Sequence, residues 1–225
     1  MNAIAFTTSR LLAILGALSL GACLTPGGQP SPLPPGSTHS CRGVPPWGKY
    51  AGPIRTEWLP GRKMKLLADV HFVDGNGKNW LAPKDAEIDG ASIPKPFWSV
   101  IGGPFDDLYR DASVFHDVAC DQRREPWEEV HCMFYQAMRA SGVPEQKAKT
   151  MYAAVYRFGP HWEKPSSGRS PASGAPVAGA PVKMMAPERP PTAADAAAIQ
   201  AWVQASDPSL EAIRTTRAIP GQPTP

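Results

Sequence analysis

The sequence lacks several features that would assign it to a familiar class. Its longest apolar run, residues 11–20, is about ten residues long, whereas a membrane-spanning helix needs about 20. The formal net charge is only +3 and there is no basic run, which excludes the electrostatic signature of a nucleic-acid-binding protein. With four cysteines and no internal repeat, neither a dense disulfide framework nor a repeat architecture is expected.

Large apolar side chains are also scarce in two Pro- and Gly-rich segments, residues 24–40 and 164–191. Such segments bury too little apolar surface to offset the entropy lost on ordering, so we expect them to be disordered. The block between them holds all five Tyr residues and six of the seven Trp residues. The predicted organisation is a signal peptide at 1–22, a lipidated cysteine and Pro-rich tether at 23–41, a folded domain at 42–162, a low-complexity linker at 163–191 and a tail with one weak helix at 192–225.

The N-terminus has the pattern of an export signal. Arg10 precedes the short apolar run, which ends in Leu20-Gly21-Ala22-Cys23. This ending resembles the lipobox of bacterial lipoprotein precursors, which implies that Cys23 is lipidated and holds the protein on a membrane. Leu24 in place of an acidic residue implies, by the same resemblance, the outer membrane, with the protein facing the periplasm. The alternative is an ordinary cleaved signal with a coincidental cysteine, which also exports the protein.

Export places the other cysteines in an oxidising compartment. If Cys23 carries lipid, then Cys41, Cys120 and Cys132 remain, an odd number that leaves at least one thiol unpaired in a monomer. The sequence does not assign the pairing. A bond between Cys120 and Cys132 is one possibility, although level-matching on two antiparallel helices separates their α-carbons by about 10 Å, beyond the ~6.8 Å usual for a disulfide.

The first half of the domain is predicted to be β-structure. Residues 64–73 alternate loosely between apolar and polar side chains, as a half-buried strand does. Residues 74–78, Asp-Gly-Asn-Gly-Lys, tolerate the positive φ angles of a tight hairpin. The return strand is expected at 79–83, followed by 86–88, and a further strand at 54–59.

The second half is predicted to be helical. Apolar residues at three-to-four spacing predict helices over 106–120, 126–142 and 144–158. The expected fold class is therefore α+β, a small antiparallel sheet followed by three packed helices and flanked by disordered Pro-rich segments. A weak amphipathic helix over 193–205 is marginal in water, so it either docks on the domain or stays mostly disordered.

The segment that joins the two halves carries a distinctive order of motifs. It contains Asp89-Gly90-Ala91-Ser92-Ile93-Pro94, Phe97-Trp98, Ile101-Gly102-Gly103-Pro104-Phe105, Ala112-Ser113 and His116-Asp117. With a later helix ending near Tyr156-Arg157-Phe158-Gly159, this order resembles the uncharacterised bacterial and phage family called domain of unknown function 1353. The resemblance covers about residues 50–160 and implies no particular activity.

His116 is the centre of the candidate site. If the first two predicted helices form a hairpin, His116 faces His131 across the pair, with Cys132 one step round the second helix. Cys120 lies one turn after His116 on the same face, and Glu128 is expected in the same small volume. A buried imidazole there needs a hydrogen-bond partner for each ring nitrogen.

One interpretation is a hydrolase in which His116 acts as general base on a water molecule. A helix-borne His-Asp pair beside a cysteine, opposite a polar residue on an antiparallel helix, resembles secreted phospholipase A2 enzymes. That resemblance implies that Asp117 and the Gly102-Gly103 loop help to hold calcium. This chain departs from the pattern because it lacks the dense disulfides, and because His131 stands where that family usually has Asp and cannot orient a cationic base as a carboxylate does.

A second interpretation is a metal site. His116, His131 and either Cys120 or Cys132 are all residue types that bind zinc. Neither a C-x-x-C nor an H-E-x-x-H spacing accompanies them, and cysteines exposed to an oxidising periplasm often oxidise. The sequence identifies no cofactor and no particular metal.

A third interpretation is structural. The pair His116-Asp117 would then fasten its helix to the loop at 89–92 by hydrogen bonds, while Cys120 and Cys132 would be a disulfide or buried thiols. In this interpretation the Asp-Gly-Ala-Ser sequence of the loop is a turn with side-chain capping.

Asp89 and Ser92 also supply, with His116, the residue types of a Ser/His/Asp triad. No G-x-S-x-G elbow surrounds Ser92, so the triad has little sequence support. The remaining histidines of the domain, His71 and His161, are expected on the surface or in loops.

The sequence thus predicts an exported, membrane-anchored lipoprotein that is a non-catalytic or structural module, envelope- or phage-derived, with an envelope partner and no nucleic-acid partner. The alternative is a general-base or metal-assisted hydrolase of an envelope component, with His116, Asp117, Asp89 and Ser92 as catalytic candidates. A catalytic His116 should line a cleft open to solvent with a carboxylate in reach, whereas an enclosed His116 indicates the structural role.

Overall fold

The computed structural model describes residues 41–163 and 183–221, apart from residues 62, 91–92, 104, 106–107, 186, 188 and 220. The expected signal peptide, Cys23 and nearly all of the tether therefore lie outside the described residues, as does most of the linker. Ser92, one of the catalytic candidates, lies outside them as well.

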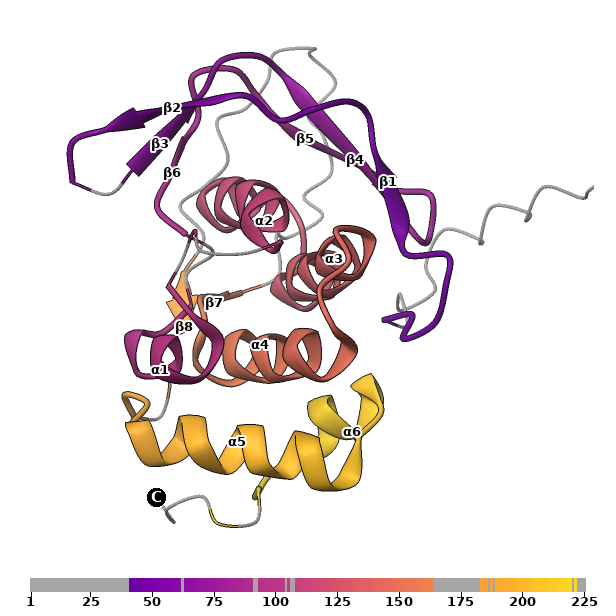
Figure 1. Cartoon of the computed structure of the whole chain (residues 1–225), viewed down its shortest axis with the longest axis vertical. Coiled ribbons are helices and arrows are strands. Elements are labelled where there is room, and N and C mark those ends of the chain that lie inside the picture. The colour runs from indigo at the N-terminus through magenta and orange to yellow at the C-terminus, as the bar shows by residue number, and fades with distance from the viewer. Residues whose placement is uncertain are drawn as a thin grey trace, which may run out of the picture. The chain divides into compact units, whose positions relative to one another are not determined.

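The β-structure forms two small antiparallel sheets of three strands each (Figure 1). The strand orders are β1-β4-β5 (Gly48–Tyr50, Val70–Asp74, Asn79–Ala82) and β2-β3-β6 (Thr56–Leu59, Lys63–Leu66, Glu87–Ile88). The single strand predicted over 64–73 is thus divided into β3 and β4, which belong to different sheets. Met64 pairs with Ile88 and Val70 pairs with Ala82 in one continuous register, so the two sheets share one long, bent hairpin.

The bend in this hairpin has its cause in the return strand. Pro83 has no N–H to donate to a ladder, and Asp85 adopts a left-handed φ of 66°. The Ala86 N–H donates to the Pro83 carbonyl at 3.2 Å, and the Asp85 N–H donates to the Leu66 carbonyl at 2.9 Å. The first bond closes a turn inside the return strand, and the second joins that turn to β3. The predicted hairpin turn follows β4 as expected, with Gly77 at a φ of 85°.

Three long helices follow the β-structure, which confirms the expected α+β class. They are α2 (Arg110–Gln122), α3 (Trp127–Ala140) and α4 (Glu145–Phe158), preceded by a 3₁₀ turn at Lys95–Phe97 and by α1 (Trp98–Ile101). The helix α2 packs against α3, and α3 packs against α4. Strands β5 and β6 contact α2, while β1 and β4 contact α3, so the sheets lie over the helical hairpin (Figure 1).

The tail helix docks on the domain. Helix α5 (Ala193–Ser206) packs against α4 and α1, and α6 (Leu210–Thr215), which the sequence analysis does not predict, also packs against α4. Thr192 and Asp195 form a reciprocal capping box that starts α5. Ile199 and Val203 of α5 are fully buried. Ahead of the tail, a two-stranded ladder pairs β7 (His161–Trp162) with β8 (Met184–Met185).

Candidate functional site

The hairpin of α2 and α3 brings two histidines together. The short connection 123–126 keeps residues at equal distance from it level with each other on the two helices. Nε2 of His116 lies 2.9 Å from Nδ1 of His131, so one ring donates a hydrogen bond to the other. Both side chains are fully buried, at 0% exposure. The predicted juxtaposition of His116 and His131 is therefore confirmed.

Cys120 completes a buried cluster with the two histidines. It lies one helical turn after His116, and its Sγ is 3.7 Å from Nε2 of that residue. One ligand atom from each of His116, Cys120 and His131 lies within 4.8 Å of the other two. We refer to these three residues as the His–Cys cluster. Burial raises the pKa of the Cys120 thiol well above its ordinary value, so the thiol is protonated.

The ring of His131 is neutral. Burial, together with the neighbouring His116 and His161, holds the pKa of His131 well below its ordinary value, and the backbone of Pro160 opposes this shift only in part. Nδ1 of His131 has His116 as its partner, but Nε2 is buried without a hydrogen bond of ordinary geometry. The cluster thus holds its nitrogen and sulfur donors in a closed environment, with the His131 ring and the Cys120 thiol uncharged.

Aromatic side chains enclose the cluster. The ring of Phe134 lies 4.5 Å from that of His116, and the ring of Trp127 lies 5.5 Å from that of His131. His161, expected on the surface or in a loop, is half-buried in β7, stacks on Trp127 at 3.9 Å and pairs through Nε2 with the Tyr156 carbonyl at 3.0 Å. No sequence signal identified this neighbour, because β7 approaches α3 only through the tertiary fold.

Asp117 forms hydrogen bonds with the backbone of the loop that precedes α1. Its Oδ2 accepts hydrogen bonds from the backbone N–H groups of Asp89 at 3.2 Å and Gly90 at 2.8 Å. The side chain of Asp117 is 5% exposed. Asp89 forms this hydrogen bond through its backbone N–H, and the residue is exposed. The expected fastening of α2 to this loop is therefore present, and Asp117 carries it.

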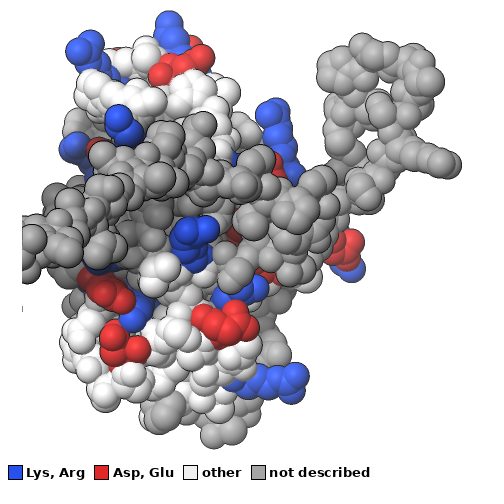
Figure 2. Space-filling view, turned by 90° about the vertical axis from the view of Figure 1, so that its right-hand side faces the viewer, with Lys and Arg blue, Asp and Glu red and all other residues white. Residues whose placement is uncertain are grey.

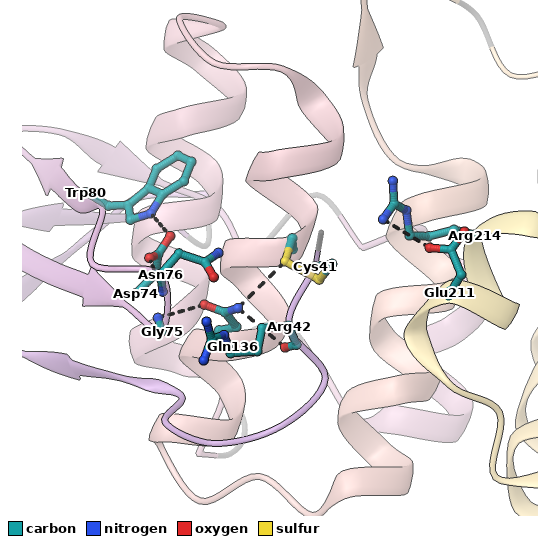
Figure 3. Close-up of a disulfide and its surroundings, with 10 residues drawn as sticks. Cys41, Arg42, Asp74, Gly75, Asn76, Trp80, Gln136, Glu211 and Arg214 are labelled. Carbon is teal, nitrogen blue, oxygen red and sulfur yellow. Dashed lines mark hydrogen bonds and ion pairs between the residues drawn. A yellow bond between two sulfur atoms is a disulfide. The ribbon is translucent and has the colours of Figure 1, made fainter. Parts of the chain in front are cut away.

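Cys132 belongs to a disulfide with Cys41, the first described residue, and not with Cys120 (Figure 3). Cys132 therefore has no thiolate to offer a metal, and the possible Cys120–Cys132 bond does not form. Gln136, one turn along α3, accepts a hydrogen bond from the Gly75 N–H at 2.9 Å and donates to the Arg42 carbonyl at 3.4 Å. The disulfide and Gln136 together hold the start of the domain and the hairpin turn against α3.

Glu128 lies at the margin of the site rather than in the cluster. It is half-buried, and its Oε2 is enclosed without a hydrogen-bond partner. Its charge favours protonation of His161, although burial still lowers the pKa of that histidine. The predicted convergence of Glu128 with His116 and His131 is therefore limited to proximity to His161.

Charged side chains of both signs are mixed on the face shown in Figure 2. Among the residues that are coloured there, neither Lys and Arg nor Asp and Glu form one continuous area. In the part of the chain that the structure describes, no helix combines the length and apolar character needed to cross a bilayer.

Residues 64–155 match the model of the family described as "Protein of unknown function (DUF1353)", and this range includes the whole His–Cys cluster. Two relatives from Sinorhizobium fredii, "Uncharacterized protein y4jT" and "Uncharacterized protein y4iH", are 48% and 45% identical over 103 and 106 residues, or 46% of this chain in each case. The chain spans 31% and 44% of the length of these two relatives. No solved structure matches the chain.

Proposed function

We propose that the domain whose residues 64–155 match the DUF1353 family model is a non-catalytic envelope module, held at a membrane by lipid on Cys23. The domain would face the periplasm from the outer membrane and contact an envelope partner. The observation that carries the non-catalytic role is the burial of two of the four candidate catalytic residues, His116 at 0% and Asp117 at 5% exposure. A general base must reach the proton of a water or substrate, which an enclosed imidazole does not.

The disulfide supports an exported location. Structural disulfides persist in oxidising compartments and are rare in the reducing cytosol. Cys41 is the last residue of the predicted tether, so its bond to Cys132 joins the end of that tether to a buried helix of the core. Such a fastening suits a domain that is held to a membrane by its N-terminus.

The hydrolase alternative loses support from the partners of its proposed catalytic residues. His116 is paired with a second histidine, where a phospholipase A2-like site would use a carboxylate to orient the base. Asp117 accepts two backbone hydrogen bonds from the loop, so its Oδ2 serves a structural contact. These contacts favour the structural interpretation of the His-Asp pair.

The lipid anchor is tested by labelling cells with radioactive palmitate. The full chain is expected to incorporate the label and to sediment with membranes, because Cys23 stands in a lipobox-like sequence. Cys23→Ser should lose both properties, and Cys120→Ser, which leaves the N-terminal pattern intact, should keep them. Full labelling of Cys23→Ser would contradict the proposed anchor.

The non-catalytic role is tested by incubating the full chain, in detergent, with phospholipid vesicles and with purified murein. We expect hydrolysis no faster than with His116→Gln. If the wild-type chain hydrolyses either substrate and a His116→Gln chain of equal circular dichroism does not, the hydrolase alternative is correct and the non-catalytic proposal is overturned.

A further inference from the structure

We infer that the His–Cys cluster is a site for one Zn²⁺ ion, bound by Nε2 of His116, Nδ1 of His131 and Sγ of Cys120. These are the atoms that the α2–α3 hairpin brings together in the core. The inference is independent of the proposed membrane anchor, and it concerns what the buried cluster does for this domain. The ion would join α2 to α3 as a structural staple.

Two of the three separations are close to those around a tetrahedral zinc ion, and the third lies within 4.8 Å. Bond lengths of about 2.0 Å to nitrogen and 2.3 Å to sulfur place two nitrogen ligands about 3.3 Å apart, and a nitrogen and a sulfur about 3.5 Å apart. The observed distances are 2.9 Å from His116 to His131 and 3.7 Å from His116 to Cys120. Binding would therefore widen the His116–His131 pair by a few tenths of an ångström and bring the Cys120 sulfur and the His131 nitrogen, which lie within 4.8 Å of each other, to about 3.5 Å.

The chemistry of the donors also suits zinc. Zn²⁺ binds well to imidazole nitrogen and thiolate sulfur, whereas Mg²⁺ and Ca²⁺ prefer oxygen ligands. A metal ligand must be deprotonated at the bonding atom, so each imidazole would bind through a nitrogen that carries no hydrogen. All three side chains are buried, at 0%, 0% and 5% exposure, so water does not compete for them at the surface.

The proton balance of binding follows from the contacts. For two neutral imidazoles, the hydrogen shared between Nε2 of His116 and Nδ1 of His131 moves to the other nitrogen of the ring that carries it, so neither ring loses a proton overall. The Cys120 thiol becomes a thiolate and releases its proton to solvent. Binding therefore releases one proton per ion, and that proton comes from Cys120.

Both helices are already fixed in place around the site. Asp117, next to His116, fastens α2 to the loop before α1, while the Cys41–Cys132 bond holds α3 at the residue after His131. These contacts reduce the entropy lost when the ligands are ordered, which favours binding. A tetrahedral ion needs a fourth ligand, which the three residues do not supply.

The test uses the full chain in detergent, stripped with a chelator and titrated with Zn²⁺ and with Co²⁺. We expect one ion per chain, release of one proton per ion by calorimetry in buffers of different ionisation enthalpy, and a thiolate-to-cobalt charge-transfer band. Zinc at about 100 times its dissociation constant should raise the melting temperature by roughly 5–10 °C. Less than stoichiometric binding, or binding without a charge-transfer band, would overturn the assignment and leave a metal-free hydrogen-bonded pair.

Variants assign the ligands. Cys120→Ser should abolish the charge-transfer band and the proton release, and His131→Gln should weaken zinc binding by more than about 100-fold, beyond the loss expected for a residue that only orients a ligand. The matched control is His71→Gln. His71 lies on β4, outside the His–Cys cluster, and forms a hydrogen bond with exposed Asn79. An unchanged zinc affinity in a folded His131→Gln chain would refute the zinc site. If that variant does not fold, the titration of the wild-type chain decides whether the cluster binds zinc.

Discussion

Removal of the disulfide measures how strongly the start of the domain depends on α3. Changing Cys41 and Cys132 together to Ala removes both sulfur atoms of the bond, so neither residue is left with an unpaired thiol and no polar group is added. The single free cysteine among the described residues, Cys120, is untouched by the double substitution. The variant therefore isolates the covalent link from the chemistry of the His–Cys cluster.

The expected loss follows from the length of chain that the bond closes. Cys41 and Cys132 are separated by 91 positions, for which the chain-entropy model gives about 4.6 kcal/mol of stabilisation through the unfolded state. Native disulfides typically contribute about 2–5 kcal/mol, so we expect the free energy of unfolding to fall within that range. A domain of ordinary stability, with a free energy of unfolding of about 5–15 kcal/mol, would remain folded but with a smaller free energy of unfolding.

Urea unfolding of the full chain, followed by tryptophan fluorescence, measures the change. With a slope of about 2 kcal/mol per molar urea, the midpoint should fall by roughly 1 to 2.5 M. A reductant supplies the matched control, because it should lower the midpoint of the wild-type chain to that of the double variant. The same reductant should leave the midpoint of the double variant unchanged.

Two results would refute this reasoning. A midpoint within about 0.3 M of the wild-type value would mean that Gln136 and the surrounding packing hold the segment without the bond. A large reductant effect on the double variant would mean that the measured stability does not come from the Cys41–Cys132 link.

Two further substitutions test individual contacts by the same unfolding assay. Asp117→Ala should cost about 2–3 kcal/mol, because the buried N–H of Gly90 and the part-buried N–H of Asp89 lose a charged acceptor. Asp121→Ala, at an exposed position, should change stability by less than about 0.5 kcal/mol, and equal effects would contradict the fastening role. Gly75→Ala should destabilise by about 1–3 kcal/mol, because the new Cβ would lie 2.2 Å from the Pro46 carbonyl oxygen. Gly43→Ala, whose Cβ meets its nearest atom at 3.4 Å, is the control, and a neutral Gly75→Ala would show that the turn moves freely.

The local elements follow from local patterns. Apolar spacing located α2, α3, α4 and α5 to within a few residues, because a helix that packs on a core carries apolar side chains along one face. The residues that allow positive φ located the hairpin turn. Pro83 carried the signal for the bend in the return strand, but a loose alternation over 64–73 does not show where one sheet ends and the next begins.

The candidate site divides in the same way. The position of His116 opposite His131 was predictable, because a short connection between antiparallel helices determines which residues are level with each other. The closure of the site was not, since it depends on Phe134, Trp127 and a strand that arrives after α4. Sequence spacing likewise placed Cys132 near the cluster, but its side chain points to a residue 91 positions earlier.

By itself the sequence determined which segments are helical or extended, and which two histidines face each other, because these depend on helix period and on a short connection. Only the tertiary structure decided which cysteines bond, whether the histidines reach water, and that the tail docks. Each of those outcomes depends on contacts between segments far apart in the chain. The direction from which such segments arrive is set by packing of the whole core, which no local pattern encodes.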